Sequence, residues 1–105
     1  MKFIETPMFT KLLKGILTDD DYKNLQLALL TNPKKGKVIP EGGGLRKIRW
    51  KIESKGKRGG VRVIYYWISA EYTFYMITLY KKSYKEDLTK EQLKALVKYV
   101  KEYLK

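Results

Sequence analysis

Residues 45–62 read LRKIRWKIESKGKRGGVR, a stretch in which basic and apolar side chains alternate. The stretch holds eight basic residues and one acid, so it supplies +7 of the chain's formal net charge of +12. Apolar residues at every second position from Ile48 are typical of a strand with one buried face. Because these residues tie the stretch to a core, the charges form a rigid cationic surface. Such a surface suits a large anion, and a nucleic-acid backbone is the leading candidate.

Strand alternation separates the side chains of residues 47–52 onto two faces. The basic set is Lys47, Arg49 and Lys51, and the apolar set is Ile48, Trp50 and Ile52. On one face the three cations would stand roughly 6.6 to 7 Å apart, close to the phosphate spacing of an extended nucleic-acid strand. Repulsion along that row is unfavourable unless an anion neutralises it. The alternative is that these cations serve only solubility and prevent edge pairing.

The whole chain of 105 residues predicts one α+β domain with the element order β-α-α-β-β-β-α, a small, twisted, mainly antiparallel sheet with helices packed on it. A weak strand at 2–5 precedes helices that begin at Thr6-Pro7 and at Thr18. After a loop at 33–44, runs at 45–53, 61–69 and 72–81 predict an antiparallel meander. A final helix begins at a capping box formed by Thr89 and Gln92.

Two glycine clusters admit different interpretations. Gly42-Gly43-Gly44 could form a phosphate-binding nest, but no helix start follows it, so a flexible turn is the better interpretation. Gly59-Gly60 is typical of a hairpin turn. A second, tight turn is expected near Ala70-Glu71.

The composition excludes several kinds of chemistry. The chain has no Cys and no His, which rules out thiol nucleophiles, histidine bases and His/Cys metal sites. No segment approaches the roughly 18 apolar residues of a membrane span, and the N-terminus lacks a signal-peptide pattern. We therefore expect a cytoplasmic protein. A pI near 9.8 favours nucleic acid, an acidic protein or an anionic membrane as partner. The membrane is the weakest of the three, because the basic cluster is not on an amphipathic helix.

Aromatic side chains accompany the cations on the second and third runs of the meander. Alternation sends some rings to the core and others to the open face, where they can stack on bases. Tyr66 shares the parity of Arg62, and Tyr80 borders Lys81, so these two are the best stacking candidates. For any single ring, core packing is the commoner outcome. Cations beside accessible rings suit single-stranded RNA better than duplex DNA.

Three segments, GGLRKIRW, KGKRGGVRVIYYW and FYMITLYKKSYKEDLTKEQ, together resemble the RelE/HigB superfamily of type II toxin–antitoxin toxins, and its HigB-like branch most closely. The resemblance covers nearly the whole chain and implies the RelE-like microbial RNase fold. It further implies a ribosome-dependent mRNA endoribonuclease (an mRNA interferase) that inhibits translation without a metal or cofactor. The implied partners are mRNA on the ribosome, with ribosomal RNA contacts, and a cognate antitoxin of helix-turn-helix type. Operator DNA would be contacted only through the antitoxin.

The resemblance also implies catalytic residues. Lys47 and Arg49 match the family's basic pair, and Arg62 matches its phosphate-binding arginine. Lys82 falls where many members have an arginine, although lysine cannot form a bidentate fork. Leu88 stands where some members have a tyrosine. The implied reaction is attack of the ribose 2′-hydroxyl on the scissile phosphate, which leaves a 2′,3′-cyclic phosphate and a 5′-hydroxyl.

Within that reaction we expect Arg62 to stabilise the charge that develops on the phosphate. Lys47 is the favoured general base, because the neighbouring cations disfavour its charged form. Whether Arg49, Lys81 or Lys82 assists the leaving group stays open. The residues expected to contact RNA are Arg46, Lys51, Lys55, Lys57, Arg58, Tyr66, Tyr80 and Lys81.

Three other functions remain open at this point. A non-catalytic module that binds RNA or the ribosome would carry the same cations and rings. A DNA-binding regulator is disfavoured, because no recognition-helix pattern occurs in the chain. An interaction protein with an acidic partner is the third alternative, and it is compatible with a toxin.

Overall fold

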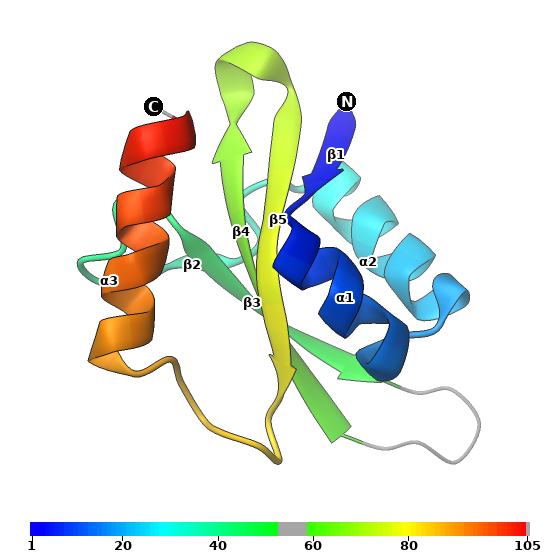
Figure 1. Cartoon of the computed structure of the whole chain (residues 1–105). Coiled ribbons are helices and arrows are strands. Elements are labelled where there is room, and N and C mark those ends of the chain that lie inside the picture. Colours follow the sequence, from blue (N-terminus) through cyan, green and yellow to red (C-terminus); the bar gives the residue numbers. More distant parts are fainter. Residues whose placement is uncertain (53–58, 105) are drawn as a thin grey trace.

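The computed structural model describes residues 1–52 and 59–104, which form an α+β fold (Figure 1). The helices are α1 (Pro7–Ile16), α2 (Asp19–Thr31) and α3 (Lys90–Tyr99), and η2 (Val100–Leu104) extends α3 with π-helical geometry. The strands are β1 (Lys2–Glu5), β2 (Lys37–Val38), β3 (Arg46–Ile52), β4 (Gly59–Ile68) and β5 (Thr73–Lys81). The predicted fold class is confirmed. No helix in these two ranges has the length and apolar character needed to cross a membrane.

Each helix begins where the sequence predicts. A threonine side chain accepts a hydrogen bond from the backbone N–H three residues later, which satisfies a donor that the first turn leaves free. The capping pairs are Thr6–Phe9, Thr18–Asp21 and Thr89–Gln92, at 3.0, 3.0 and 3.1 Å. In the last two pairs the third residue's side chain also accepts from the threonine N–H, which completes a capping box.

The strands form one mixed sheet in the order β1-β5-β4-β3-β2. The meander β3-β4-β5 is antiparallel as predicted, and β1 adds to β5 in parallel. The turn between β4 and β5 is the short helical turn η1 (Ser69–Glu71), and Tyr72 then adopts a left-handed conformation with φ of 50°.

Two local predictions were wrong. The loop at 33–44 contains β2, which pairs antiparallel with the start of β3. A strand of two residues is too short to show an alternating pattern, so the sequence gives no sign of it. Gly59 and Gly60 belong to β4 and pair with Ile52 and Lys51, so they are not turn residues. Residues 54–58, the rest of the predicted turn, and Glu53, the last residue of the predicted run 45–53, lie outside the described residues. The glycines at 42–44 do form a turn, with positive φ at Gly43 and Gly44.

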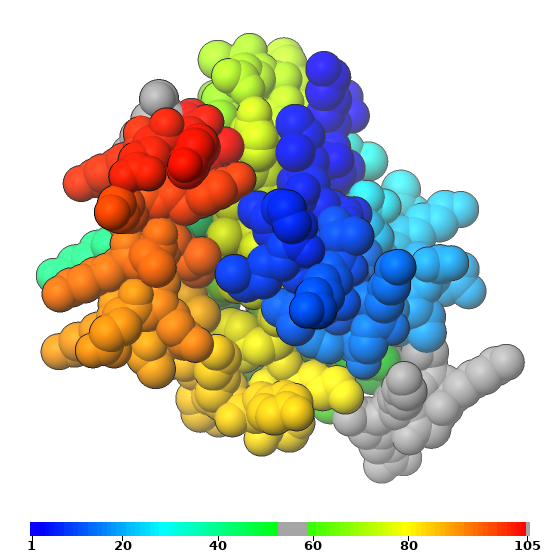
Figure 2. Space-filling view, in the orientation of Figure 1, coloured from blue at the N-terminus to red at the C-terminus, as the bar shows by residue number. Residues whose placement is uncertain are grey.

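Helices cover the two faces of the sheet unequally (Figures 1 and 2). The larger core lies between the sheet and the helices α1 and α2, on what we call the α1/α2 face. Its buried members are Phe9, Leu17, Leu25, Leu29, Ile48, Ile52, Val61, Val63, Tyr65, Phe74, Met76 and Leu79. The α3 face has a smaller core of Leu45, Ile64, Ile77, Tyr80 and Val100. In the space-filling view β5 (yellow) remains visible between α3 (orange) and α1 (blue).

A β-bulge in β5 brings residues of that strand to both cores. Ile64 pairs with Thr78 and Tyr65 pairs with Met76, so Ile77 is the extra residue. Met76 is therefore buried in the larger core, while its neighbour Ile77 is buried in the smaller one. Beyond the bulge, the alternation brings Tyr80 to the α3 face.

Candidate functional site

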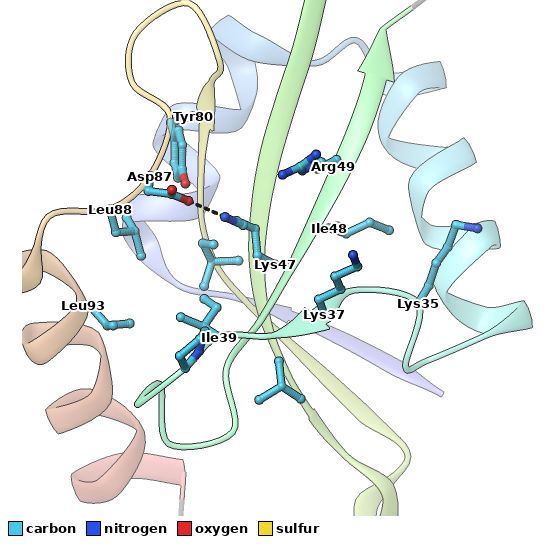
Figure 3. Close-up of a pocket in the computed structure, with 13 residues that line it drawn as sticks. Lys35, Lys37, Ile39, Lys47, Ile48, Arg49, Tyr80, Asp87, Leu88 and Leu93 are labelled. Carbon is cyan, nitrogen blue, oxygen red and sulfur yellow. Dashed lines mark hydrogen bonds and ion pairs between the residues drawn. The ribbon is translucent and has the colours of Figure 1, made fainter.

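The basic residues of β3 lie on the α3 face, opposite the apolar residues of the same strand. Ile48 and Ile52 are buried in the larger core, as the alternation predicts. Lys47 and Arg49 line a hollow on the other face (Figure 3). Lys51 is exposed further along the strand.

The register of the sheet forms a row of polar side chains across three strands. Arg49 of β3 pairs with Arg62 of β4, and Arg62 pairs with Tyr80 of β5. Residues that pair across neighbouring strands share a face and are separated by about 5 Å. The backbones of the two arginines and the tyrosine therefore stand within roughly 10 Å of one another, with their side chains on the α3 face.

Arg62 is the most unusual residue in this row, because its charged side chain is almost completely buried. Only 5% of Arg62 is exposed, and within the described residues it has no hydrogen bond or ion pair. A Cβ atom placed on Gly60 would lie 3.1 Å from Nη1 of Arg62 and 3.8 Å from Cβ of Lys82. The missing side chain at Gly60 thus leaves room for the guanidinium, and Lys82 lies beside the same point. Buried arginines are normally paired, so this one is poised to bind an anion.

Tyr80 presents a second unsatisfied donor to the site. Its ring is 7% exposed, and its hydroxyl is buried with no hydrogen-bond partner among residues 1–52 and 59–104. The ammonium of Lys85 lies 5.0 Å from the ring centroid, a cation–π contact that helps to fix the ring. Burial, followed by the nearby Asp87 carboxylate, raises the pKa of Tyr80, so the hydroxyl keeps its proton at neutral pH.

Asp87 contributes a carboxylate that sequence reasoning missed. It lies between β5 and α3, and its Oδ1 forms an ion pair and hydrogen bond with Nζ of Lys47 (Figure 3). The hydrogen bond from Lys47 holds the pKa of Asp87 below its usual range, and the charges of Lys47, Arg49 and Arg62 act in the same direction. The ammonium of Lys47 donates to Asp87 and has no acceptor site, so Lys47 can act as a base only after it has left Asp87 and lost a proton.

The hollow has a volume of about 710 Å³ and combines cations with an apolar wall. Its basic residues are Lys35, Lys37, Lys47 and Arg49. Its apolar wall comes from β2 and the following turn and from the α3 side, and consists of Val38, Ile39, Pro40, Leu88 and Leu93. Phosphate would be attracted to the first set, while a ribose or base could pack on the second.

The four residues predicted as catalytic therefore share one face: Lys47, Arg49, Arg62 and Lys82. The predicted RNA-binding residues are less uniform. Arg46 lies on the α1/α2 face, where it pairs with Tyr65 and donates to the carbonyl oxygens of Gly36 (2.8 Å) and Lys34 (3.4 Å). Lys81 shares the face of its partner Val61, away from Arg62.

The two predicted stacking residues are both packed against other parts of the chain. Tyr66 packs against the smaller core, and its ring leaves no room for a side chain at Gly44. Tyr80 exposes too little of its ring to stack on a base. Lys55, Lys57 and Arg58 lie outside the described residues. Sequence reasoning missed Asp87, Lys35 and Lys37. Asp87 lies within the segment FYMITLYKKSYKEDLTKEQ, and the two lysines lie in the predicted loop at 33–44.

The fold and the hollow define a class of protein: a small basic α+β domain with a cationic hollow on one face of its sheet. A chain of a solved structure, the "Crystal structure of the intact E. coli RelBE toxin-antitoxin complex", has the same fold, with a TM-score of 0.53 at 18% identity. The match covers 73% of this chain and 90% of that chain. The family model "RelE toxin of RelE / RelB toxin-antitoxin system" matches residues 1–105. The chain therefore belongs to the RelE toxin family, while its place in the HigB-like branch stays a prediction.

Proposed function

We propose that this RelE-family protein is a ribosome-dependent mRNA endoribonuclease that inhibits translation. The observation that carries the proposal is Arg62, a nearly buried guanidinium without a partner in the described residues, between Arg49 and Tyr80. A protein that keeps such a group in its free form loses stability, because an unpaired buried charge is costly. A bound phosphate would remove that cost.

The proposed reaction is transfer of the phosphate from the 5′-oxygen of one nucleotide to the 2′-oxygen of its neighbour. The 2′-oxygen forms a bond to phosphorus as its proton leaves to a base, and the bond from phosphorus to the 5′-oxygen breaks as that oxygen takes up a proton. Arg62 binds the phosphoryl oxygens, and Arg49 and Lys82 add positive charge around them. Lys47 is the proposed base: once released from Asp87 it gives up a proton to solvent, and its neutral amine then accepts the proton of the 2′-hydroxyl. These side chains supply the positive charge themselves, so the proposed reaction uses no metal ion.

Single-stranded mRNA on the ribosome is the substrate that suits the hollow. Lys35, which precedes β2, and Lys37 of β2 line the same hollow as Lys47 and Arg49 and extend its positive charge (Figure 3). Lys51, with Lys55, Lys57 and Arg58, would contact ribosomal RNA. Binding through such phosphate contacts should weaken as the salt concentration rises. A ribosomal substrate also implies a cytoplasmic location.

A cognate antitoxin is the proposed protein partner, in keeping with the toxin–antitoxin complex that the solved relative represents. An apolar groove of about 400 Å³ lies between α1 and α3, and Met8, Leu12 and Leu96 are among the residues that line it. Beside the groove, residues 78–81 of β5 have no strand partner on the β1 side in the described part of the chain. A helix-turn-helix antitoxin that alone contacts operator DNA stays a prediction.

The decisive experiment is the Arg62→Ala variant in a translating extract, with message ends mapped and growth arrest followed in cells. We expect the wild type to cut within codons and the variant to cut at least about 100-fold more slowly, because it loses the main phosphate donor. Its stability should not fall, since the variant removes an unpaired buried charge.

Lys98→Ala is the matched control, because it removes one positive charge from an exposed position of α3. It should cleave like the wild type. Cleavage retained by Arg62→Ala would refute the assignment of Arg62. Growth arrest by the wild type without any cut message would instead support the non-catalytic ribosome-binding alternative.

A further inference from the structure

The hydroxyl of Tyr80 stands out when the buried tyrosines of this chain are compared. Tyr65 is completely buried, yet its hydroxyl donates to the carbonyl of Pro33 at 2.8 Å and accepts from the N–H of Gly36 at 2.9 Å. Tyr80 has neither kind of bond within the described residues. The buried hydroxyl of Tyr22 also lacks a bond there, but it lies beside Glu5, outside the hollow. A buried tyrosine with a purely structural role is normally satisfied, as Tyr65 is.

The Tyr80 hydroxyl is placed to contact the same anion as Arg62. Tyr80 and Arg62 are direct partners across β4 and β5, so their side chains emerge side by side on the α3 face. Figure 3 shows the hydroxyl of Tyr80 pointing to the carboxylate of Asp87, next to the ammonium of Lys47. The raised pKa of Tyr80 keeps the hydroxyl protonated, so it can donate a hydrogen bond but is a poor base.

We propose that Tyr80 is a further catalytic residue, whose hydroxyl donates a hydrogen bond to a non-bridging oxygen of the scissile phosphate. This inference rests on the proposed ribonuclease function. Negative charge on that oxygen grows as the 2′-oxygen attacks, so the hydrogen bond is stronger in the transition state than in the bound substrate. Tyr80 transfers no proton in this step. The proton of the 2′-hydroxyl leaves to the base, and the 5′-oxygen receives its proton from another group.

Asp87 explains why this hydroxyl is covered in the free protein. The carboxylate holds Lys47 and lies beside Tyr80, where it occupies the position that a phosphate would take. Entry of the phosphate displaces the carboxylate, and the anion then meets donors from Arg62 and Tyr80, while Lys47 is released to act as the base. The substrate thereby replaces one internal ion pair and satisfies donors of Arg62 and Tyr80 for which the described residues offer no hydrogen bond.

The test is a single-turnover cleavage assay with Tyr80→Phe on ribosomes programmed with a short message. This substitution removes only the hydroxyl and keeps the ring that packs in the smaller core. We expect the cleavage rate constant to fall roughly 100-fold. Binding of a message with a 2′-deoxy nucleotide at the cleavage position should stay within threefold of the wild type. Tyr75→Phe is the matched control on the same strand, because its hydroxyl bonds Glu71 at 3.3 Å outside the hollow.

A phosphorothioate at the scissile phosphate distinguishes direct contact of the Tyr80 hydroxyl with the phosphate from a purely structural role of that hydroxyl. Sulfur accepts hydrogen bonds poorly, so one of the two diastereomers should slow the wild type but have little added effect in Tyr80→Phe. Equal sensitivity of both proteins to both diastereomers would overturn the inference. So would wild-type cleavage by Tyr80→Phe, and in that case loss of cleavage in Arg62→Ala would leave the proposed function standing. Absence of cleavage by the wild type would overturn both.

Discussion

The two faces of the sheet are built from the same strands but obey different rules. The larger core on the α1/α2 side buries twelve side chains, and its members from β3, β4 and β5 are all aliphatic, aromatic or Met. The α3 face buries five side chains in its smaller core, and the cationic hollow occupies another part of the same face. One face therefore supplies stability, whereas the other keeps charged and polar groups that no described residue satisfies. That division is typical of proteins that store unfavourable electrostatics at a functional site.

Three consecutive residues of β4 illustrate the difference. Val61 and Val63 are completely buried against the helices α1 and α2. Arg62 is almost as buried but points to the opposite face. Because alternation alone separates them, a substitution at either valine should change stability, while one at Arg62 should change activity.

The largest expected effect tests whether a substitution in the larger core can lower stability without changing the cleavage that we assign to the hollow. Phe74 is completely buried and stacks on Phe3 at 4.7 Å and against Trp67 at 4.4 Å. Phe74→Ala should lower the free energy of unfolding by about 4 kcal/mol, through lost apolar burial and the cavity left behind. Urea denaturation followed by tryptophan fluorescence measures the loss.

Phe74→Leu is the milder companion, with an expected loss of about 1.5 kcal/mol. Per folded molecule, it should cleave message at the wild-type rate, because Phe74 and Arg62 lie on opposite faces. Tyr84→Ala serves as control, since Tyr84 is 84% exposed and should change stability by no more than about 0.5 kcal/mol. A folded Phe74→Leu protein with a tenfold loss of cleavage would show that the faces are not independent.

Much of the fold was predictable because local rules decide it. The threonine caps and the alternation in β3 depend on neighbours within a few residues, and both were confirmed. β2 and the bulge at Ile77 were not predictable, since each exists only through pairing with a distant strand. Gly59 and Gly60 were misassigned because glycine also serves outside turns: Gly60 allows the close approach of Arg62, and Gly59 adopts a positive φ of 139° at the start of β4.

The candidate site was predictable only as far as strand parity extends. Alternation gives the shared face of Lys47 and Arg49, but the pairing of Arg49 with Arg62 depends on register, which no local pattern specifies. The burial of Tyr80 depends on packing near α3, which periodicity within β5 cannot reveal. Asp87 lies in a loop without periodicity, and its contact with Lys47 spans 40 residues.

A smaller effect tests why β4 has glycine beside its buried arginine. Gly60→Ala places a Cβ atom 3.1 Å from Nη1 of Arg62, so the guanidinium must shift by a few tenths of an ångström. Cleavage should fall roughly tenfold, because transition-state contacts are sensitive to small displacements. Single-turnover kinetics measure the fall.

Gly15→Ala is the same substitution in α1, away from the hollow, where a Cβ atom would meet nothing within 4 Å. It should raise the free energy of unfolding by about 0.5 to 1 kcal/mol, because alanine favours the helix. Its cleavage rate should not change. If Gly60→Ala also cleaves like the wild type, the spatial link between Gly60 and Arg62 has no catalytic consequence.

The smallest effect concerns the ion pair between Lys47 and Asp87, which lies in the hollow. The pKa of Asp87 is lowered on folding, mainly by its hydrogen bond with Lys47, so the pair stabilises the fold at neutral pH. That contribution is lost as the pH falls below about 4 and through the lowered pKa, where the folded state also takes up the proton. Because the Asp87 side chain is 67% exposed, Asp87→Asn should cost no more than about 0.5 kcal/mol at pH 7. Denaturation at pH 7 and pH 2.5 should show this difference shrinking, and 0.5 M salt should reduce it at pH 7.

At neutral pH the Asp87→Asn variant should bind the 2′-deoxy message about two- to threefold more tightly, since one competing negative charge is gone. Glu86→Gln removes the same charge from the neighbouring position, where the structure gives no bond to Lys47, so it should change stability less. A stability loss in Asp87→Asn that persists undiminished at pH 2.5 would mean that this carboxylate supports the loop by some contact other than its charge.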